Sequence, residues 1–301
     1  MLLTRRSLLT IPLALRAESQ APLVDTHLHL FSGDTKTFPF HKNATYAPPP
    51  APLEAYVAFA NQAGIAHAVI VHPEPYQDDH SYLEYCFAHE PSKNFFKGTC
   101  LFDAFRPDTP ARIAALTKRW PGRIRALRIH CTQIESLSSG AIHDRPLDST
   151  QMLSTWRAAA ELGLMIQMHF IPAYAEQIGR LAAKVPTATV ILDHLGRSGL
   201  ASQADWRQVV ALSKHRNTIM KFSGVNYSSK ELWPHRDAMP RVRQLFDAFG
   251  SDRIVWGGLG MNMPEFQKAN LLFDEFFAFT SEANREKIRG RNALSIFGWP
   301  A

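Results

Sequence analysis

The chain has 301 residues, of which 46% are hydrophobic and 20% are charged, and this composition excludes a disordered protein. Its formal charge of +6 includes three arginines within residues 1–16, where no acid offsets them, so the rest of the chain carries +3. The remaining basic residues form no block, which argues against a nucleic-acid partner. No stretch reaches the roughly 20 apolar residues that a membrane-spanning helix needs.

The first residues read MLLTRRSLLTIPLALRA, in which paired arginines precede a short apolar run. This pattern is similar to a twin-arginine export signal. We therefore predict a signal over residues 1–20, a mature domain over residues 21–301, and a periplasmic or secreted location. Because Arg16 follows the apolar run closely, a partly apolar N-terminal arm is the alternative.

Apolar segments rich in β-formers alternate with segments of helical periodicity along the chain. The predicted strands are residues 24–30, 66–72, 96–102, 124–130, 164–170, 189–195, 218–224 and 253–258. The predicted helices include residues 53–63, 109–119, 150–162, 174–184, 203–213, 239–248 and 266–280. Eight such units are typical of a single-domain α/β fold, the (β/α)8 TIM barrel. An open doubly wound sheet is the alternative, but no glycine-rich dinucleotide turn follows the first strand.

Polar side chains gather at the C-terminal ends of the predicted strands. In VDTHLHLF (residues 24–31), His27 and His29 are two residues apart and share one face of a strand. The same alternation pairs residues on three other strands, and two further strands end near a histidine. These residues are Arg128 with His130, Gln167 with His169, Lys221 with Ser223, and the single histidines His72 and His194. Because barrel strands end at one mouth, we expect these side chains to converge on a ligand or an ion.

Four histidines form a candidate metal site at this mouth, namely His27, His29, His169 and His194. Neutral imidazoles are ligands that zinc accepts, so this set could hold a divalent metal such as zinc. The same rings could instead polarise a substrate carbonyl without a metal. By strand alternation Asp193 points away from His194 and is expected to be structural, whereas Asp25 is expected to orient a histidine.

Several motifs connect the chain to a known family. In chain order they are VDTHLHLF, VHPEPYQDDHSYL, IRALRIH, MIQMHF, VILDHLGR, MKFSG, GSDRIVWGG and RNALSIFG, between residues 24 and 298. The chain resembles the amidohydrolase superfamily, in the amidohydrolase-related branch of TIM-barrel hydrolases that includes sugar lactonases and pyrone-dicarboxylate lactonase. The resemblance implies hydrolysis at the barrel mouth, commonly of a lactone or a C–N bond. It also implies a zinc-type metal in some members and none in some lactonases.

Residue by residue, the resemblance matches His27 and His29 to the family's first-strand pair, His169 to its fifth-strand histidine and His194 to its sixth-strand histidine. One position departs from the pattern. The family usually has W-G-[ST]-D-[WY]-P after the eighth strand, and here WGGLGMNMPE puts Leu259 in place of the aspartate.

The resemblance implies that this aspartate acts as the acid/base and, in metal-bound members, as a metal ligand. Leucine can serve as neither. We therefore expect weak or absent metal binding. We also expect another group to take the proton of the attacking water, and the candidates are His72, Glu74, Asp103, His130 and Glu265. One of the two histidines is favoured because an imidazole titrates near neutrality.

The leading functional prediction is a hydrolase that opens a lactone or a related cyclic ester by water attack. Arg128 and Arg197 are candidate clamps for a substrate carboxylate, and Lys221 and His72 are candidate substrate contacts. The expected partner is therefore a small molecule that is anionic or sugar-like. Two alternatives stay open: an exported ligand-binding protein with an impaired site, for which Leu259 is the reason, and a metal-dependent decarboxylase.

Overall fold

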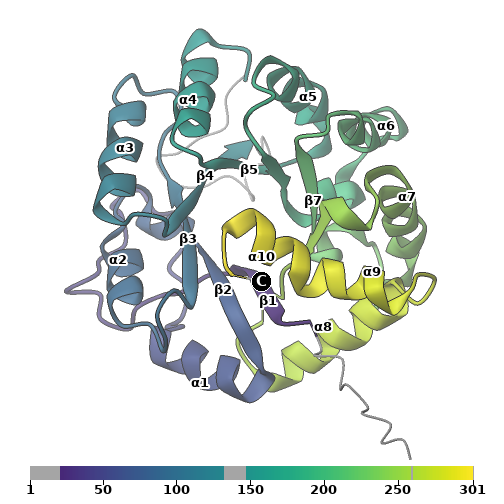
Figure 1. Cartoon of the computed structure of the whole chain (residues 1–301), viewed down its shortest axis with the longest axis horizontal. Coiled ribbons are helices and arrows are strands. Elements are labelled where there is room, and N and C mark those ends of the chain that lie inside the picture. The colour runs from purple at the N-terminus through teal and green to yellow at the C-terminus, as the bar shows by residue number, and fades with distance from the viewer. Residues whose placement is uncertain (1–20, 132–146, 259, 301) are drawn as a thin grey trace, which may run out of the picture.

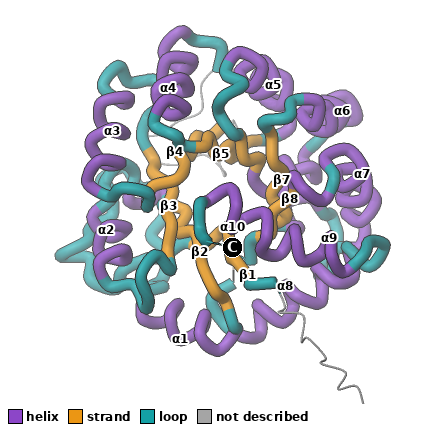
Figure 2. Tube along the Cα trace, in the orientation of Figure 1, coloured by secondary structure: helices purple, strands orange, loops and turns teal. Residues whose placement is uncertain are grey.

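The computed structural model describes residues 21–131, 147–258 and 260–300. Eight strands form one sheet in which every neighbouring pair is parallel and the spatial order follows the chain. The strands are β1 (Leu23–Leu28), β2 (Ile65–Val71), β3 (Phe96–Leu101), β4 (Ile124–Cys131), β5 (Met165–Phe170), β6 (Val190–Leu192), β7 (Thr218–Phe222) and β8 (Ile254–Trp256). Figure 2 shows them as a ring inside the helices.

Helices α1 to α8 lie around this ring, and each follows the strand of the same number (Figure 1). The helices are α1 (Leu53–Ala63), α2 (Ser81–Ala88), α3 (Thr109–Arg119), α4 (Thr150–Glu161), α5 (Ala175–Lys184), α6 (Gln203–Ala211), α7 (Met239–Phe249), α8 (Met263–Phe276), α9 (Glu282–Glu286) and α10 (Asn292–Phe297). The predicted single-domain (β/α)8 barrel is therefore confirmed.

Side-chain bonds join the last strand to the first. The hydroxyl of Thr26 on β1 donates to the backbone carbonyl of Trp256 on β8 at 2.6 Å. One residue along, the carboxylate of Asp25 accepts a hydrogen bond from the backbone N–H of Gly258 at 2.8 Å. These two bonds tie the seam of the barrel at the level where the site begins.

The C-terminal helix α10 closes the opposite end of the barrel, and Figure 1 shows it lying across the centre of the strand ring. Phe297 and Trp299 pack there in one buried cluster with lumen residues that include Val24, Met165 and Ile219. Because this end is filled by apolar side chains, the mouth at the C-terminal ends of the strands is the end left for a site.

The predicted export signal, residues 1–20, lies outside the described residues, so the signal and the periplasmic or secreted location stay predictions. Among the helices that the structure describes, none combines the length and apolar character that crossing a bilayer requires.

Candidate active site

His27, on β1, and His29, just after it, face His194 at the barrel mouth. The Nε2 atoms of His27 and His29 lie 3.3 Å apart, and the ring of His194 lies 4.6 Å from that of His27. The Nδ1 atom of His29 lies 2.7 Å from the carbonyl oxygen of Val71. A carbonyl only accepts hydrogen bonds, so Nδ1 of His29 carries the proton and its Nε2 presents a lone pair. That the pair shares a ligand stays a prediction.

The imidazoles at the mouth are neutral at neutral pH. Burial, with the positive charge of Arg128 added to it, lowers the pKa of His29 to about 3. Burial also lowers the pKa of His194 to about 3, against a smaller opposing effect of Asp193. The pKa of His27 lies well below its usual range for the same first reason, burial. Neutral rings can accept a proton, bind a metal or donate one N–H to an oxygen atom.

Asp193 lies at the centre of the polar cluster, and the prediction that it points away from His194 is wrong. Its two carboxylate oxygens accept hydrogen bonds from the amide of Gln167 at 3.0 and 2.9 Å. The ammonium of Lys221 lies 3.3 Å from one oxygen, and a guanidinium nitrogen of Arg128 lies 3.4 Å from the other. The Nδ1 atom of His27 is 3.8 Å away.

The physical reason for this error is the early end of β6. The strand ends at Leu192, and His194, Leu195, Gly196 and Arg197 then have left-handed backbone conformations with φ between 48° and 62°. The alternation of strand side chains does not extend into such a turn. The turn directs both Asp193 and His194 into the cluster.

Lys221 and Asp193 form a fully buried ion pair, each with no exposed side-chain area. Lys221 also donates to the backbone carbonyl of Thr26 at 3.0 Å, which links β7 to β1. Burial alone would raise the pKa of Asp193, but Lys221 and Arg128 outweigh it and hold that pKa well below its usual range. Asp193 is therefore the negative centre of a cluster in which the fixed positive charges are in excess.

Arg197 contributes a third positive charge at the mouth. Its Nε donates to Nε2 of His169 at 3.0 Å, and its guanidinium lies 4.1 Å from the ring centre of Tyr227. The ring of Tyr227 in turn meets that of His194 edge to face at 5.3 Å. These contacts fix the orientation of the guanidinium, a group whose terminal N–H groups can bind a carboxylate.

The other predicted site residues divide into two groups. His130 lies edge to face against His169, at 4.9 Å between ring centres, and neither of its ring nitrogens has a hydrogen-bond partner among the described residues. His72, by contrast, lies 3.0 Å from the carbonyl oxygen of Gln77 and packs on His80 at 4.3 Å. The structure thus brings His130 into the cluster and places His72 in contacts outside it.

Asp25 supports the site through the backbone. Its carboxylate accepts from the backbone N–H groups of His27 and Gly258, and from the hydroxyl of Tyr56 at 3.4 Å. Burial outweighs these bonds and raises its pKa to about 6. It was expected to orient a histidine ring, and its contact is with the main chain of His27 instead.

Leu259, which stands where the family pattern has an aspartate, lies outside the described residues, so its consequences stay predictions. The described residues on either side continue the polypeptide from β8 into α8. The replacement of an acidic residue at this position rests on the sequence alone.

Comparison with protein families gives one match over nearly the whole described chain, to the amidohydrolase model at residues 24–299. The chain belongs to the amidohydrolase family. The 4-sulfomuconolactone hydrolase of Rhizobium radiobacter is 29% identical over 237 residues, which are 77% of this chain and 73% of that protein. The L-fucono-1,5-lactonase of Burkholderia ambifaria is 26% identical over 216 residues, which are 69% of this chain and 68% of that protein.

Solved structures show the same fold. A putative 2-pyrone-4,6-dicarboxylic acid hydrolase from Pseudomonas putida superposes with a TM-score of 0.75 at 20% identity, covering 93% of this chain and 99% of that one. The family membership and the barrel inferred from the sequence motifs are thus confirmed. The family match and the two lactone hydrolases among the relatives indicate that this chain is a hydrolase.

A metal ion of the zinc type is implied by the family resemblance, and part of the cluster suits one. His27, Asp193 and His194 are buried, and each offers one ligand atom, these atoms lying within 4.8 Å of one another. Nδ1 of His27 has no hydrogen-bond partner among the described residues, and nitrogen and carboxylate oxygen are zinc ligands. The grouping includes two of the four predicted histidines, His27 and His194, and adds Asp193. Nε2 of His169 instead accepts from Arg197.

Proposed function

We propose that this chain hydrolyses a lactone or a related cyclic ester that carries an anionic group. The observation that carries the proposal is the charge of the cluster. Arg128, Lys221 and Arg197 are three positive groups near one carboxylate, Asp193, in a buried site next to neutral imidazoles. The two lactone hydrolases among the relatives support the same reaction class.

The positive charges would bind and orient the substrate anion. Arg197 is held by His169 and Tyr227, and Arg128 lies against Asp193; both arginines are buried. A carboxylate between two guanidinium groups accepts several charge-assisted hydrogen bonds. The lactone ring attached to that carboxylate would then lie over the imidazoles of the mouth.

Binding of the anion would also prepare the imidazoles for proton transfer. The pKa of His130 is depressed first by burial and then by Arg128, with a further contribution from Arg197. A substrate anion between the two arginines offsets the second and third of these effects and raises the basicity of the ring. We assign to His130 the proton of the attacking water, because its ring nitrogens have no other partner among the described residues.

The remaining step is stabilisation of the charge that develops on the lactone carbonyl. Because the proton of the His29 ring is on Nδ1, the contact between the two Nε2 atoms requires that His27 donates and His29 accepts. The His27 N–H can turn from His29 to the carbonyl oxygen as negative charge grows there. His27, Asp193 and His194 are the residues that would hold a zinc-type ion, which would supply a Lewis acid to the site.

The test is turnover by the full chain of a panel of sugar lactones, dicarboxylate lactones and simple esters, with and without added zinc. Arg128→Met should raise the KM for anionic lactones by about tenfold or more, because a charge-assisted hydrogen bond is lost. Arg243→Met is the matched control, since Arg243 is half exposed and pairs with Asp247 on α7.

Two results would count against the proposal. If no panel member is hydrolysed but the lactones shift the melting temperature of the protein, the ligand-binding alternative is supported instead. Release of carbon dioxide from an unsaturated carboxylic acid would support the decarboxylase.

A further inference from the structure

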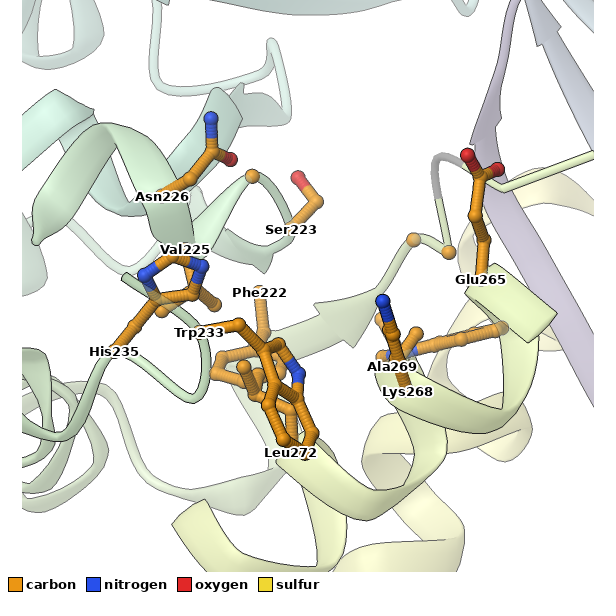
Figure 3. Close-up of a pocket in the computed structure, with 14 residues that line it drawn as sticks. Phe222, Ser223, Val225, Asn226, Trp233, His235, Glu265, Lys268, Ala269 and Leu272 are labelled. Carbon is orange, nitrogen blue, oxygen red and sulfur yellow. The ribbon is translucent and has the colours of Figure 1, made fainter. Parts of the chain in front are cut away.

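A cavity opens beside the polar cluster, between the segment that follows β7 and the helix α8. Its volume is about 420 Å³, which lies within the range of small-molecule sites. Figure 3 shows side chains from α8, including Glu265 and Lys268, facing side chains from the β7 end, including Ser223 and Asn226, across open space. None of the predicted site histidines lines it, so the mechanism above leaves the cavity unused.

The inner wall of the cavity is the outer wall of the polar cluster. Ser223 lines the cavity and its hydroxyl lies 2.9 Å from Nδ1 of His194. Gly257 also lines it, and a Cβ atom at that position would lie only 2.7 Å from Cβ of His27. A ligand in this cavity would therefore be separated from His194 by Ser223 and from His27 by Gly257.

The deeper lining is apolar. Phe222, Trp256 and Leu272 are at most 7% exposed and form the floor. Trp233 lines the cavity from the segment between β7 and α7 and is 48% exposed, and its neighbour Leu232 is 90% exposed. Large apolar side chains that remain accessible next to an apolar cavity are characteristic of a ligand site.

The charged side chains of the lining lie at the rim. Lys268 and Glu265 project from the first turns of α8, and His235 projects from the facing segment. These groups leave the floor free of charge, so an ionised group at the floor would lose its hydration without a partner. An aryl or alkyl group fits the floor, and a sugar or a second carboxylate does not.

We infer that this cavity is the subsite for an apolar substituent, aryl or alkyl, on the lactone ring. The inference rests on the proposed lactone hydrolysis, and it adds the substrate class. The lactone carbonyl lies at His27 and His29, and the substituent extends past Ser223 and Gly257 onto Phe222 and Trp256. Substrate preference is thus set by the side of the mouth between β7 and β8.

The test compares γ-phenyl-γ-butyrolactone with unsubstituted γ-butyrolactone. The wild-type kcat/KM should be higher for the phenyl lactone by about tenfold or more, because burying an aromatic ring in an apolar pocket favours binding by that amount. Ala269→Phe fills the cavity from α8 and should bring this ratio close to one. Leu271→Phe is the matched control on the same helix, because Leu271 is 60% exposed and does not line the cavity.

A binding measurement separates this inference from the proposed function. The lactam 5-phenyl-2-pyrrolidinone, which resists hydrolysis, should quench tryptophan fluorescence in the wild type and in Leu271→Phe, and should do so at least tenfold less tightly in Ala269→Phe. If neither lactone is hydrolysed, this titration still decides the subsite, and turnover of the anionic lactones in the panel decides the proposed function separately. Equal lactam binding by all three proteins would overturn the subsite, as would a wild-type preference ratio near one.

A second variant protects the test against misfolding of Ala269→Phe. Trp233→Ala removes a half-exposed wall and should also weaken lactam binding by severalfold, with a melting temperature close to that of the wild type. Unchanged lactam affinity in Trp233→Ala and in a folded Ala269→Phe would refute the inference.

Discussion

Replacement of Asp193 by asparagine should destabilise the fold through the buried charges it leaves behind. Lys221 has no exposed side-chain area and the Arg128 side chain is 4% exposed, and both point at the Asp193 carboxylate. Breaking one partner of a buried ion pair typically costs about 3–5 kcal/mol, since the other charge stays buried without compensation. The free energy of unfolding of Asp193→Asn should fall by an amount in that range.

A double-mutant cycle isolates the pair from other effects of the substitution. Lys221→Met should also destabilise, because Asp193 then keeps Arg128 as its partner with a fixed positive charge but loses the ammonium at 3.3 Å. In the double variant no uncompensated Lys221 charge remains, so its loss of stability should be smaller than the sum of the two single losses by about 1–3 kcal/mol. Urea unfolding of all four proteins at pH 7.5 measures the cycle. Losses that add within about 0.5 kcal/mol would refute the coupling that the geometry implies.

Three further predictions concern pH, metal and substrate. Burial in the folded chain lowers the pKa of His29 and His194 to about 3, from the ordinary histidine value of 6.5. The part of the folding stability that depends on these two neutral histidines is therefore fully present above pH 6.5 and is lost as the pH falls toward 3. A free energy of unfolding that stays constant between about pH 7.5 and 5 would contradict this. Lys221→Met should bind zinc about tenfold or more tightly than wild type in calorimetric titration, since a competing cation next to Asp193 is gone, and unchanged affinity would show that Lys221 does not compete. Arg197→Lys loses the bond to His169 and the stacking on Tyr227, so its KM for an anionic lactone should rise about tenfold at a similar kcat; an unchanged KM would argue against the clamp.

The strands were predictable because apolar β-formers and their helical partners repeat eight times. The predicted range 96–102 corresponds to β3 (Phe96–Leu101), and the predicted helices 53–63 and 109–119 coincide with α1 and α3. The sixth strand was predicted to residue 195 but ends at Leu192. Four consecutive left-handed residues cause the difference, and nothing in VILDHLGR except its single glycine signals them.

The converging histidines were predictable from strand alternation, but their charged surroundings were not. Lys221 and Arg128 were recognised as lumenal, whereas their common partner Asp193 was assigned to the wrong side. The partner could only be found in three dimensions, because the turn after β6 lies outside the alternation rule. The cavity under α8 was also out of reach, since Trp233 and Ala269 line it from elements far apart in the chain.

The closure of one barrel end by α10 was also not predictable from the sequence. The sequence predicts a helix at residues 266–280, and the structure has α8 at Met263–Phe276 followed by the shorter α9 and α10. Helices of five and six residues give too little periodicity to recognise. The function of α10 in filling the barrel end follows only from the contacts of Phe297, its last residue, and of Trp299 just after it.

The central claim, water attack on a lactone at the barrel mouth, is tested most directly by product analysis after turnover in ¹⁸O-labelled water. The account predicts a hydroxy acid that contains one heavy oxygen in its new carboxylate and none in its hydroxyl group, with formation abolished or strongly slowed in His130→Ala. A product that has lost carbon dioxide, or heavy oxygen in the hydroxyl group, would contradict it.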